Sequence, residues 1–191
     1  MNAEPGADPA DGPDRPLARP VAVLVGPPGA GKSTVAAALA ALLGGQVRDT
    51  DSDVEAAAGK SVADIFLDDG EPAFRELERE AVVRALASHP GVLSLGGGAV
   101  MDPLTEQALR GHAVVFLDVG IQAAARRIGF NRDRPLLIGN PRAQWMRLME
   151  NRRPVYERVA TIRVETDRAT PAELARQIAE ALGLPVQEEA R

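Results

Sequence analysis

A glycine-rich loop near the N-terminus decides which folds this chain can adopt. Residues 26–33 read GPPGAGKS and satisfy the phosphate-binding pattern G-x-x-x-x-G-K-S. The preceding run, Val21–Val25, is aliphatic throughout, as is typical of a strand buried on both faces, and Ser33–Leu43 consists of good helix formers. This order of strand, loop and helix predicts a nucleotide-binding P-loop domain and disfavours an incidental glycine-rich turn.

The loop also predicts its ligand. Its backbone N–H groups and the start of the following helix would surround the phosphates of a nucleotide. Lys32 would reach the outer phosphates and the Ser33 hydroxyl would ligate Mg²⁺, so ATP with Mg²⁺ is the expected occupant. A GTPase is disfavoured, because no guanine-reading N-K-x-D occurs. The ATP-binding residues predicted in this loop are Gly29, Ala30, Gly31, Lys32, Ser33 and Thr34.

Apolar runs and helical stretches alternate along the rest of the chain. Such alternation predicts an α/β fold of three layers, α/β/α, in which helices cover both faces of a five-stranded parallel sheet. Ligands of such folds bind at the carboxyl ends of the strands. The predicted strands are Val21–Val25, Gln46–Asp49, Gly91–Leu95, Ala113–Val119 and Thr161–Val164, and the main predicted helices are Ser33–Leu43, Glu71–Ser88, Pro103–Arg110, Ile121–Ile128 and Pro171–Leu182.

Composition excludes several classes of function. The formal net charge of −5 provides no global positive field for binding a nucleic acid. The absence of cysteine excludes disulfides, thiolate catalysis and thiolate metal sites. The acidic start lacks the pattern of a signal peptide, and no apolar run is long enough for a membrane helix. We therefore expect a cytoplasmic protein that binds neither nucleic acid nor membrane, and we expect a monomer.

The chain reads as one domain between two tails. Residues 1–19 are rich in Pro, Ala, Gly and Asp and predict a disordered tail, residues 20–184 predict a single P-loop domain, and residues 185–191 form a C-terminal tail. The segment 126–142 is dense in arginine and in helix breakers. We expect it to be a lid that brings an arginine to a transferring phosphate and excludes water, with a basic surface loop as the alternative. Trp145 and Tyr156 are expected to be packing residues.

Three carboxylates follow the second predicted strand at alternate positions, Asp49, Asp51 and Asp53. Taken alone, this pattern is typical of a solvated turn and a helix start, where Asp is favoured as a cap. Beside a P-loop, the topology places the first two at the carboxyl edge of the sheet, close to the nucleotide. We expect Asp49 to hold Mg²⁺ through water, Asp51 to accept a hydrogen bond from an attacking hydroxyl, and Asp53 to cap the helix.

Two arginines and a run of glycine indicate a small acid as the phosphoryl acceptor. Arg75 lies on a predicted helix and Arg152 at the end of a later one, and an arginine fork suits a carboxylate. The alternatives are an ion-pair ladder with Glu71 and Glu78 for the first arginine and helix-terminus electrostatics for the second. Residues 96–98 are three glycines after the third strand, which favours a substrate packed against bare backbone and bound by its N–H groups.

Together these features resemble shikimate kinase, a member of the nucleoside-monophosphate-kinase-like P-loop group, from about Pro20 to Gly183. The resemblance implies a sheet ordered 2-3-1-4-5, a lid over the nucleotide, and ATP-dependent conversion of shikimate to shikimate 3-phosphate in chorismate and aromatic amino-acid biosynthesis. Seven motifs carry it, in order: G-x-x-x-x-G-K-S-T at Gly26–Thr34, D-T-D at Asp49–Asp51, A-D-I-F at Ala63–Phe66, F-R-x-x-E at Phe74–Glu78, S-L-G-G-G at Ser94–Gly98, R-P-L-L at Arg134–Leu137 and R-x-P-x-Y at Arg152–Tyr156.

The resemblance also implies roles for the residues that match these motifs. Asp51 would contact the ring hydroxyls of shikimate, and Arg75 and Arg152 would bind its carboxylate. Gly97 and Gly98 would contact the ring through their backbone.

On the nucleotide side, Lys32 and Arg134 would hold the transferring phosphate, so Lys32, Asp51 and Arg134 are the candidate catalytic residues. Near the last strand the family often has an arginine beside the adenine, and this chain has Ala169 there with Arg168 adjacent. The remaining implied roles are Ser33 and Asp49 for Mg²⁺, Phe66 and Phe74 as walls of the pocket, and Arg127 stacking on the adenine.

The residues alone lead to a kinase of a small hydroxy acid, without identifying its ring. Gluconate kinase is the nearest alternative, although D-T-D, F-R-x-x-E and the triple glycine favour shikimate. Adenylate kinase is disfavoured because nothing in the sequence reads a second nucleobase. A non-catalytic nucleotide-binding module is disfavoured by the intact set of Lys32, Asp51, Arg75, Arg134 and Arg152.

Overall fold

The computed structural model describes residues 19–128 and 140–186 of the chain. Most of the two predicted tails and of the predicted lid, Arg134 included, lies outside the described residues. The boundaries of the tails and of the lid therefore stay predictions.

A five-stranded parallel sheet in the order β2-β3-β1-β4-β5 forms the centre of the molecule. This is the predicted order, and every predicted strand is present with its ends within one residue of the prediction. The phosphate loop leaves the central strand, so the carboxyl ends of β3 and β4 flank it on either side. The strands are β1 (Ala22–Val25), β2 (Val47–Asp49), β3 (Val92–Ser94), β4 (Val114–Asp118) and β5 (Ile162–Glu165).

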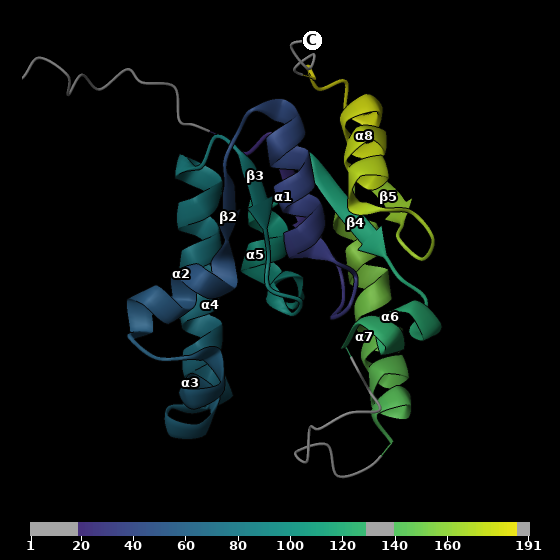
Figure 1. Ribbon diagram of the computed structural model, residues 1–191. Coiled ribbons are helices and arrows are strands. Elements are labelled where there is room, and N and C mark those ends of the chain that lie inside the picture. The colour runs from purple at the N-terminus through teal and green to yellow at the C-terminus, as the bar shows by residue number, and fades with distance from the viewer. Residues whose placement is uncertain (1–18, 129–139, 187–191) are drawn as a thin grey trace, which may run out of the picture.

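Helices cover both faces of the sheet, as Figure 1 shows: α1 and α8 pack together on one face, and α5 and α7 lie on the other. No helix in the described part of the chain is both long enough and apolar enough to span a bilayer. The helices are α1 (Lys32–Leu43), α2 (Thr50–Ala58), α3 (Val62–Asp68), α4 (Gly70–Ser88), α5 (Pro103–Ala108), α6 (Ile121–Ile128), α7 (Pro141–Val159) and α8 (Pro171–Ala181), with a short 3₁₀ helix η1 (Ala99–Met101).

The described part of the chain has two hydrophobic cores. The main core surrounds the sheet, whose central strands β1 and β4 are buried along their whole length. A small second core is built from Val54, Ile65, Phe74 and Ala81 on α2, α3 and α4. Burial of such aliphatic and aromatic side chains is the main force that fixes these helices against one another. The second core therefore positions the part of the chain that carries Asp51, Phe66 and Arg75.

Two local predictions were wrong. Asp53 does not cap α2: Asp49 occupies the cap position and accepts from the N–H of Asp51, because α2 begins directly where β2 ends. Arg152 does not lie at a helix end, because α7 continues through Pro154 to Val159. Proline removes one helical hydrogen bond but leaves the helix intact here.

The reason α7 continues lies on either side of the proline. Before it, Arg153 forms two hydrogen bonds, of 2.8 and 2.7 Å, with the buried carboxylate of Asp118 at the end of β4. After it, Tyr156 is completely buried against the sheet. Packing on both sides therefore outweighs the local tendency of proline to end the helix.

Candidate active site

The phosphate loop joins β1 to α1. Gly31 is the N-cap of α1 with φ of 88°, a left-handed conformation that glycine adopts without strain. The Lys32 ammonium bends back over the loop and donates to the Gly26 carbonyl at 2.9 Å. A cavity of about 360 Å³ opens over the loop and is lined by Gly29, Gly31, Lys32, Ser33, Thr34 and Arg127. The structure therefore gathers most of the predicted ATP-binding residues around one cavity, whereas Ala30 does not line it and Arg134 lies outside the described residues.

Ser33 and Asp49 provide the oxygen atoms expected around Mg²⁺. The Ser33 hydroxyl donates to Oδ2 of Asp49 at 3.3 Å, although the two residues come from different elements. Within the described residues, no three His, Asp or Glu side chains are grouped as a metal site. This donor set fits a Mg²⁺ ion that takes its other ligands from nucleotide phosphates and water.

Asp51 lies at the start of α2, where it retains exposed surface. Partial burial of the Asp51 carboxyl and the negative charge of Asp49 raise the pKa of Asp51. The positive charge of Lys32 opposes this shift. A Cβ atom built on Gly96 would lie 2.5 Å from Oδ1 of Asp51 and 2.7 Å from Oε1 of Glu78. Glycine at position 96 therefore allows both carboxylates to approach the end of β3.

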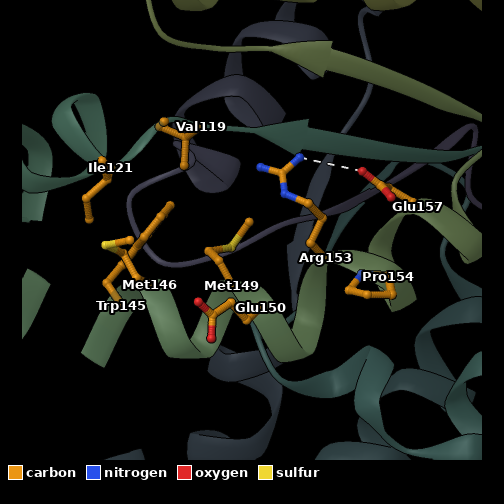
Figure 2. A pocket seen from close by; sticks show the side chains of 10 residues that line it. Val119, Ile121, Trp145, Met146, Met149, Glu150, Arg153, Pro154 and Glu157 are labelled. Atoms are coloured by element: carbon orange, nitrogen blue, oxygen red, sulfur yellow. Dashed lines mark ion pairs between the residues drawn. The ribbon is translucent and has the colours of Figure 1, made fainter. Parts of the chain in front are cut away.

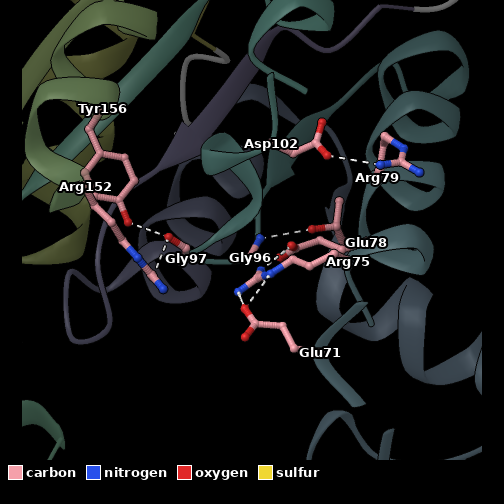
Figure 3. A network of polar contacts seen from close by, with 10 residues as sticks. Glu71, Arg75, Glu78, Arg79, Gly96, Gly97, Asp102, Arg152 and Tyr156 are labelled. Atoms are coloured by element: carbon pink, nitrogen blue, oxygen red, sulfur yellow. Dashed lines mark hydrogen bonds and ion pairs between the residues drawn. The ribbon is translucent and has the colours of Figure 1, made fainter. Parts of the chain in front are cut away.

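Arg75 lies on α4 and forms part of the polar network in Figure 3. Its Nη1 bonds to Oε2 of Glu78 at 2.5 Å, and its Nη2 pairs with Oε1 of Glu71 at 3.1 Å. A Cβ atom on Gly98 would lie 2.6 Å from the same Nη1. The predicted ion-pair ladder thus exists, and in addition it holds the guanidinium against the triple-glycine loop.

Glu78 is the buried member of this network, with 3% of its surface exposed. Burial raises its pKa, and Arg75 opposes the shift only in part. Sequence reasoning placed Glu78 only in a surface ladder. The F-R-x-x-E motif was the available signal, because its glutamate lies one helical turn after its arginine on the same face.

Arg152 reaches the same loop from the opposite side. Its Nη1 donates to the carbonyl oxygen of Gly97 at 2.9 Å, and Figure 3 shows its guanidinium on the side of the glycines away from Arg75. Arg75 on α4 and Arg152 on α7 therefore converge on neighbouring glycines. Had the two groups faced solvent on separate sides of the molecule, a shared carboxylate site would have been excluded.

Two aromatic side chains lie beside Arg75. The ring centroids of Phe66 and Phe74 are 4.5 Å apart, and the Arg75 guanidinium lies 5.1 Å from the Phe74 centroid. Phe74 is buried, whereas Phe66 is 38% exposed. This arrangement is consistent with the predicted wall of an acceptor pocket.

Arg127, at the end of α6, anchors the other side of the phosphate loop. Its Nη1 donates to the Gly29 carbonyl and to the Thr166 hydroxyl, each at 3.0 Å, and its Nη2 donates to the Thr166 carbonyl. An adjoining apolar cavity of about 180 Å³ is lined by Ala30, Gly31, Thr34, Val35, Arg127, Ala169, Pro171 and Leu174. Ala169, which stands where the family often has an arginine, thus lines this cavity together with Arg127.

Three polar contacts of the site were not predicted. The indole Nε1 of Trp145 donates to the Pro28 carbonyl at 3.2 Å, and the Tyr156 hydroxyl donates to the Gly97 carbonyl at 2.5 Å. The Thr50 hydroxyl accepts from the Gly96 N–H at 3.0 Å. Trp145 and Tyr156 are buried as expected, but only a structure could show which carbonyls they reach.

A further cavity, of about 390 Å³, lies elsewhere. It lies between α7 and the segment from β4 to α6, and Figure 2 shows Trp145, Met146, Met149, Val119 and Ile121 around it. Two of its charged lining residues pair with each other, Arg153 with Glu157 at 3.6 Å. It carries neither the phosphate loop nor Asp51, so we assign the chemistry to the smaller cavities.

A parallel sheet of this order, with a phosphate loop after its central strand and an acceptor site on the neighbouring strand ends, defines a P-loop kinase of small molecules. The family model for shikimate kinase matches residues 28–183. The chain belongs to the shikimate kinase family, and it is an ATP-dependent kinase.

Individual relatives agree with this assignment. The shikimate kinase of Thermobifida fusca is 54% identical and the alignment covers 86% of this chain and 95% of the relative. That of Salinispora arenicola is 58% identical over 84% of this chain and 96% of the relative. A solved shikimate kinase from Acinetobacter baumannii, in complex with shikimate, superposes with a TM-score of 0.79 at 32% identity, covering 87% of this chain and 94% of that one.

Gluconate kinase, the nearest alternative from the sequence, also shares the fold. A gluconokinase from Sinorhizobium meliloti superposes with a TM-score of 0.55 at 21% identity, over 88% of this chain and 94% of that one. A likeness of this degree reflects the shared fold alone. The comparisons therefore favour shikimate kinase over gluconate kinase.

Proposed function

We propose that this chain transfers the γ-phosphoryl group of ATP to the 3-hydroxyl of shikimate, giving ADP and shikimate 3-phosphate. The observation that carries the substrate assignment is the convergence of Arg75 and Arg152 on Gly97 and Gly98, beside Asp51. Two guanidinium groups, a carboxylate and bare backbone in this arrangement match the carboxylate, the hydroxyls and the ring of such an acid. The curated relatives named shikimate kinase support the same substrate.

The phosphate loop would hold the triphosphate. Its N–H groups and the N-terminus of α1 would bind phosphate oxygens, with Gly29 to Thr34 as the contact segment. Lys32 would leave the Gly26 carbonyl and turn to the outer phosphates. Arg127 would meet the adenine over the apolar cavity next to Ala169, while its hydrogen bonds keep the loop in shape.

On the acceptor side, Arg75 and Arg152 would bind the carboxylate and so fix the orientation of the ring. Phe66 and Phe74 would contact one face of the ring. Asp51 would accept the proton of the attacking hydroxyl as the bond to phosphorus forms. Holding both reactants in line accounts for a large part of the rate enhancement in phosphoryl transfer.

Ser33 and, through water, Asp49 would hold Mg²⁺, and the ion would neutralise negative charge on the phosphates when bound. Lys32 would stabilise the charge of the transferring group, and we assign a second positive group to Arg134 from its R-P-L-L motif. A single domain over residues 20–184, a lid at about 126–142, a monomeric state and a cytoplasmic location stay predictions from the sequence.

A coupled assay of ADP release, with shikimate, gluconate and AMP offered in parallel, tests the proposal. We expect rapid ADP release with shikimate and only background release with gluconate, AMP or no acceptor. Product analysis by phosphorus NMR should show a phosphate monoester at the 3-position. Preference for gluconate, or ADP release that needs no acceptor, would contradict the assignment.

A further inference from the structure

Two side chains of α7 donate to one carbonyl oxygen at the acceptor site. The Tyr156 hydroxyl reaches the oxygen of Gly97 at 2.5 Å, and Nη1 of Arg152 reaches the same oxygen at 2.9 Å (Figure 3). Arg152 would also bind the substrate. Tyr156, which lies one helical turn further along α7, has no such role in the proposed mechanism.

The sheet fixes the position of the Tyr156 hydroxyl. The side chain is completely buried, and its ring stacks on Phe116 of β4 with centroids 5.1 Å apart and an angle of 20° between the ring planes. Burial raises the pKa of the phenol, so the hydroxyl keeps its proton and remains a hydrogen-bond donor at neutral pH. The donor that meets Gly97 is therefore held by packing against the central sheet.

Fixing the Gly97 carbonyl also fixes the N–H of Gly98. The two groups belong to one planar trans peptide unit and point in opposite directions. Since the carbonyl points to α7, the N–H points away from α7. Within the described ranges, no acceptor pairs with this N–H, although Gly98 is buried. A buried, unpaired N–H beside the Arg75 guanidinium is suited to bind an oxygen of the acid.

Glycine makes this orientation dependent on an external restraint. A peptide unit between two glycines can rotate more freely than any other, because neither residue has a Cβ atom. A Cβ on Gly98 would lie 2.6 Å from Nη1 of Arg75, so a larger residue there would displace the guanidinium, whereas a Cβ on Gly97 would meet no atom closer than 3.5 Å. A side chain from outside the loop can therefore fix the orientation of this peptide plane. Two side chains donate to the Gly97 carbonyl, the charged Arg152 and the uncharged Tyr156.

We propose that Tyr156 is a positioning residue for the acid site: its hydroxyl holds the Gly97–Gly98 peptide so that the Gly98 N–H faces the acid substrate and Arg152 keeps its place beside it. This inference rests on the proposed function. It predicts that loss of the hydroxyl weakens binding of the acid and leaves binding of ATP unchanged. A residue that serves packing alone would show no such selectivity.

The test is Tyr156→Phe, which keeps the ring and its stacking on Phe116 and removes only the hydroxyl. We expect the KM for shikimate to rise about five- to tenfold, as for one lost hydrogen bond, with an unchanged KM for ATP and a kcat lowered less than the KM is raised. Titration calorimetry with shikimate should show the same loss of affinity. Thermal denaturation should show a folded variant.

Thr161→Val is the matched control. The Thr161 hydroxyl also bonds to two backbone groups, the N–H of Val114 at 3.1 Å and the carbonyl of His112 at 3.2 Å. This contact lies at the amino ends of β4 and β5, whereas the acid site lies at the carboxyl ends of the strands. We expect this variant to lower the Tm without changing the KM for shikimate. An unchanged KM for shikimate in Tyr156→Phe, or an equal rise in both variants, would overturn the role of Tyr156 and leave the proposed function standing. Wild-type protein that is inactive on shikimate would overturn both.

Discussion

The hydroxyl of Ser33 lies 3.3 Å from Oδ2 of Asp49, which brings the end of the phosphate loop and the end of β2 together at one point. Asp49 also caps α2 through its other oxygen, which accepts from the Asp51 N–H at 3.0 Å. The Asp49 carboxylate therefore caps helix α2, which carries Asp51, and also faces the expected position of the metal.

Asp49→Asn should raise the Mg²⁺ concentration needed for half-maximal activity by about tenfold, because a neutral amide is a weaker partner for the hydrated ion. Asparagine is a good N-cap, so α2 should remain intact. Initial rates over a Mg²⁺ series measure the effect. Asp53→Asn is the control, since Asp53 pairs with Arg48 at 2.7 Å instead; an equal shift in both variants would refute the metal assignment.

Asp51→Asn should lower kcat severely, by about 10²- to 10⁴-fold, because it removes the group that accepts the hydroxyl proton. Asparagine has nearly the same shape as aspartate, so the affinity of the variant for ATP should remain close to that of the wild type. Steady-state kinetics together with calorimetric titration of ATP separate the two quantities. Equal losses of turnover and of ATP affinity would contradict the role of Asp51.

Arg75→Lys should raise the KM for the acid by about tenfold or more and leave the KM for ATP nearly unchanged, since lysine lacks the planar fork that binds a carboxylate. Arg79→Lys is the matched control one turn along α4, where Arg79 pairs with Asp102 at 3.1 Å. An unchanged KM for the acid in Arg75→Lys would remove Arg75 from the pocket.

Arg127→Ala should raise the KM for ATP by about tenfold, because the guanidinium holds the Gly29 carbonyl and lines the apolar cavity beside Ala169. Arg126→Ala is the comparison, since Arg126 is the preceding, exposed residue of α6. Kinetics with ATP varied at saturating acid measure the change. If the two variants behave alike, Arg127 has no special place at the nucleotide.

Glu78→Gln should change how stability depends on pH. Burial raises the pKa of Glu78, so the folded state binds this proton more tightly than the unfolded state. The carboxyl therefore contributes stability below its unfolded pKa, and this contribution is lost as the pH rises through the raised folded pKa. The free energy of unfolding of the wild type, relative to Glu78→Gln, should fall over that window.

Urea denaturation at a series of pH values measures this difference. Glu76→Gln serves as the control, because Glu76 is an exposed residue of the same helix. A difference between wild type and Glu78→Gln that does not vary with pH would show that Glu78 titrates as an ordinary glutamate.

Local patterns were sufficient to predict the sheet and the phosphate loop. Continuous aliphatic runs such as Val21–Val25 specify buried parallel strands, and the spacing of the loop specifies its ligand. The residues suggested that Arg75 and Arg152 together bind a carboxylate, but local patterns could not establish this, since Arg75 also fits a surface ion-pair ladder and Arg152 also fits helix-terminus electrostatics. The structure brings the two arginines to neighbouring glycines.

The two wrong predictions have different causes: at Arg152 tertiary contacts outweighed a local rule, whereas at Asp53 the predicted start of α2 was misplaced. Arg152 was predicted to lie at the end of a helix, but the ion pair of Arg153 with Asp118 and the burial of Tyr156 keep α7 intact through Pro154. Asp53 was taken as a cap because Asp is favoured there, whereas Asp49 occupies that position and Asp53 pairs with Arg48.

Helix α7 touches the phosphate loop through Trp145 and the triple-glycine loop through Arg152. The two side chains are separated by two helical turns, or about 10 Å along the axis. The helix is therefore a spacer of fixed length between donor and acceptor. Inserting one residue between them would turn one contact about 100° away from its loop. Insertions should thus be selected against in this stretch of α7 more strongly than in an exposed loop.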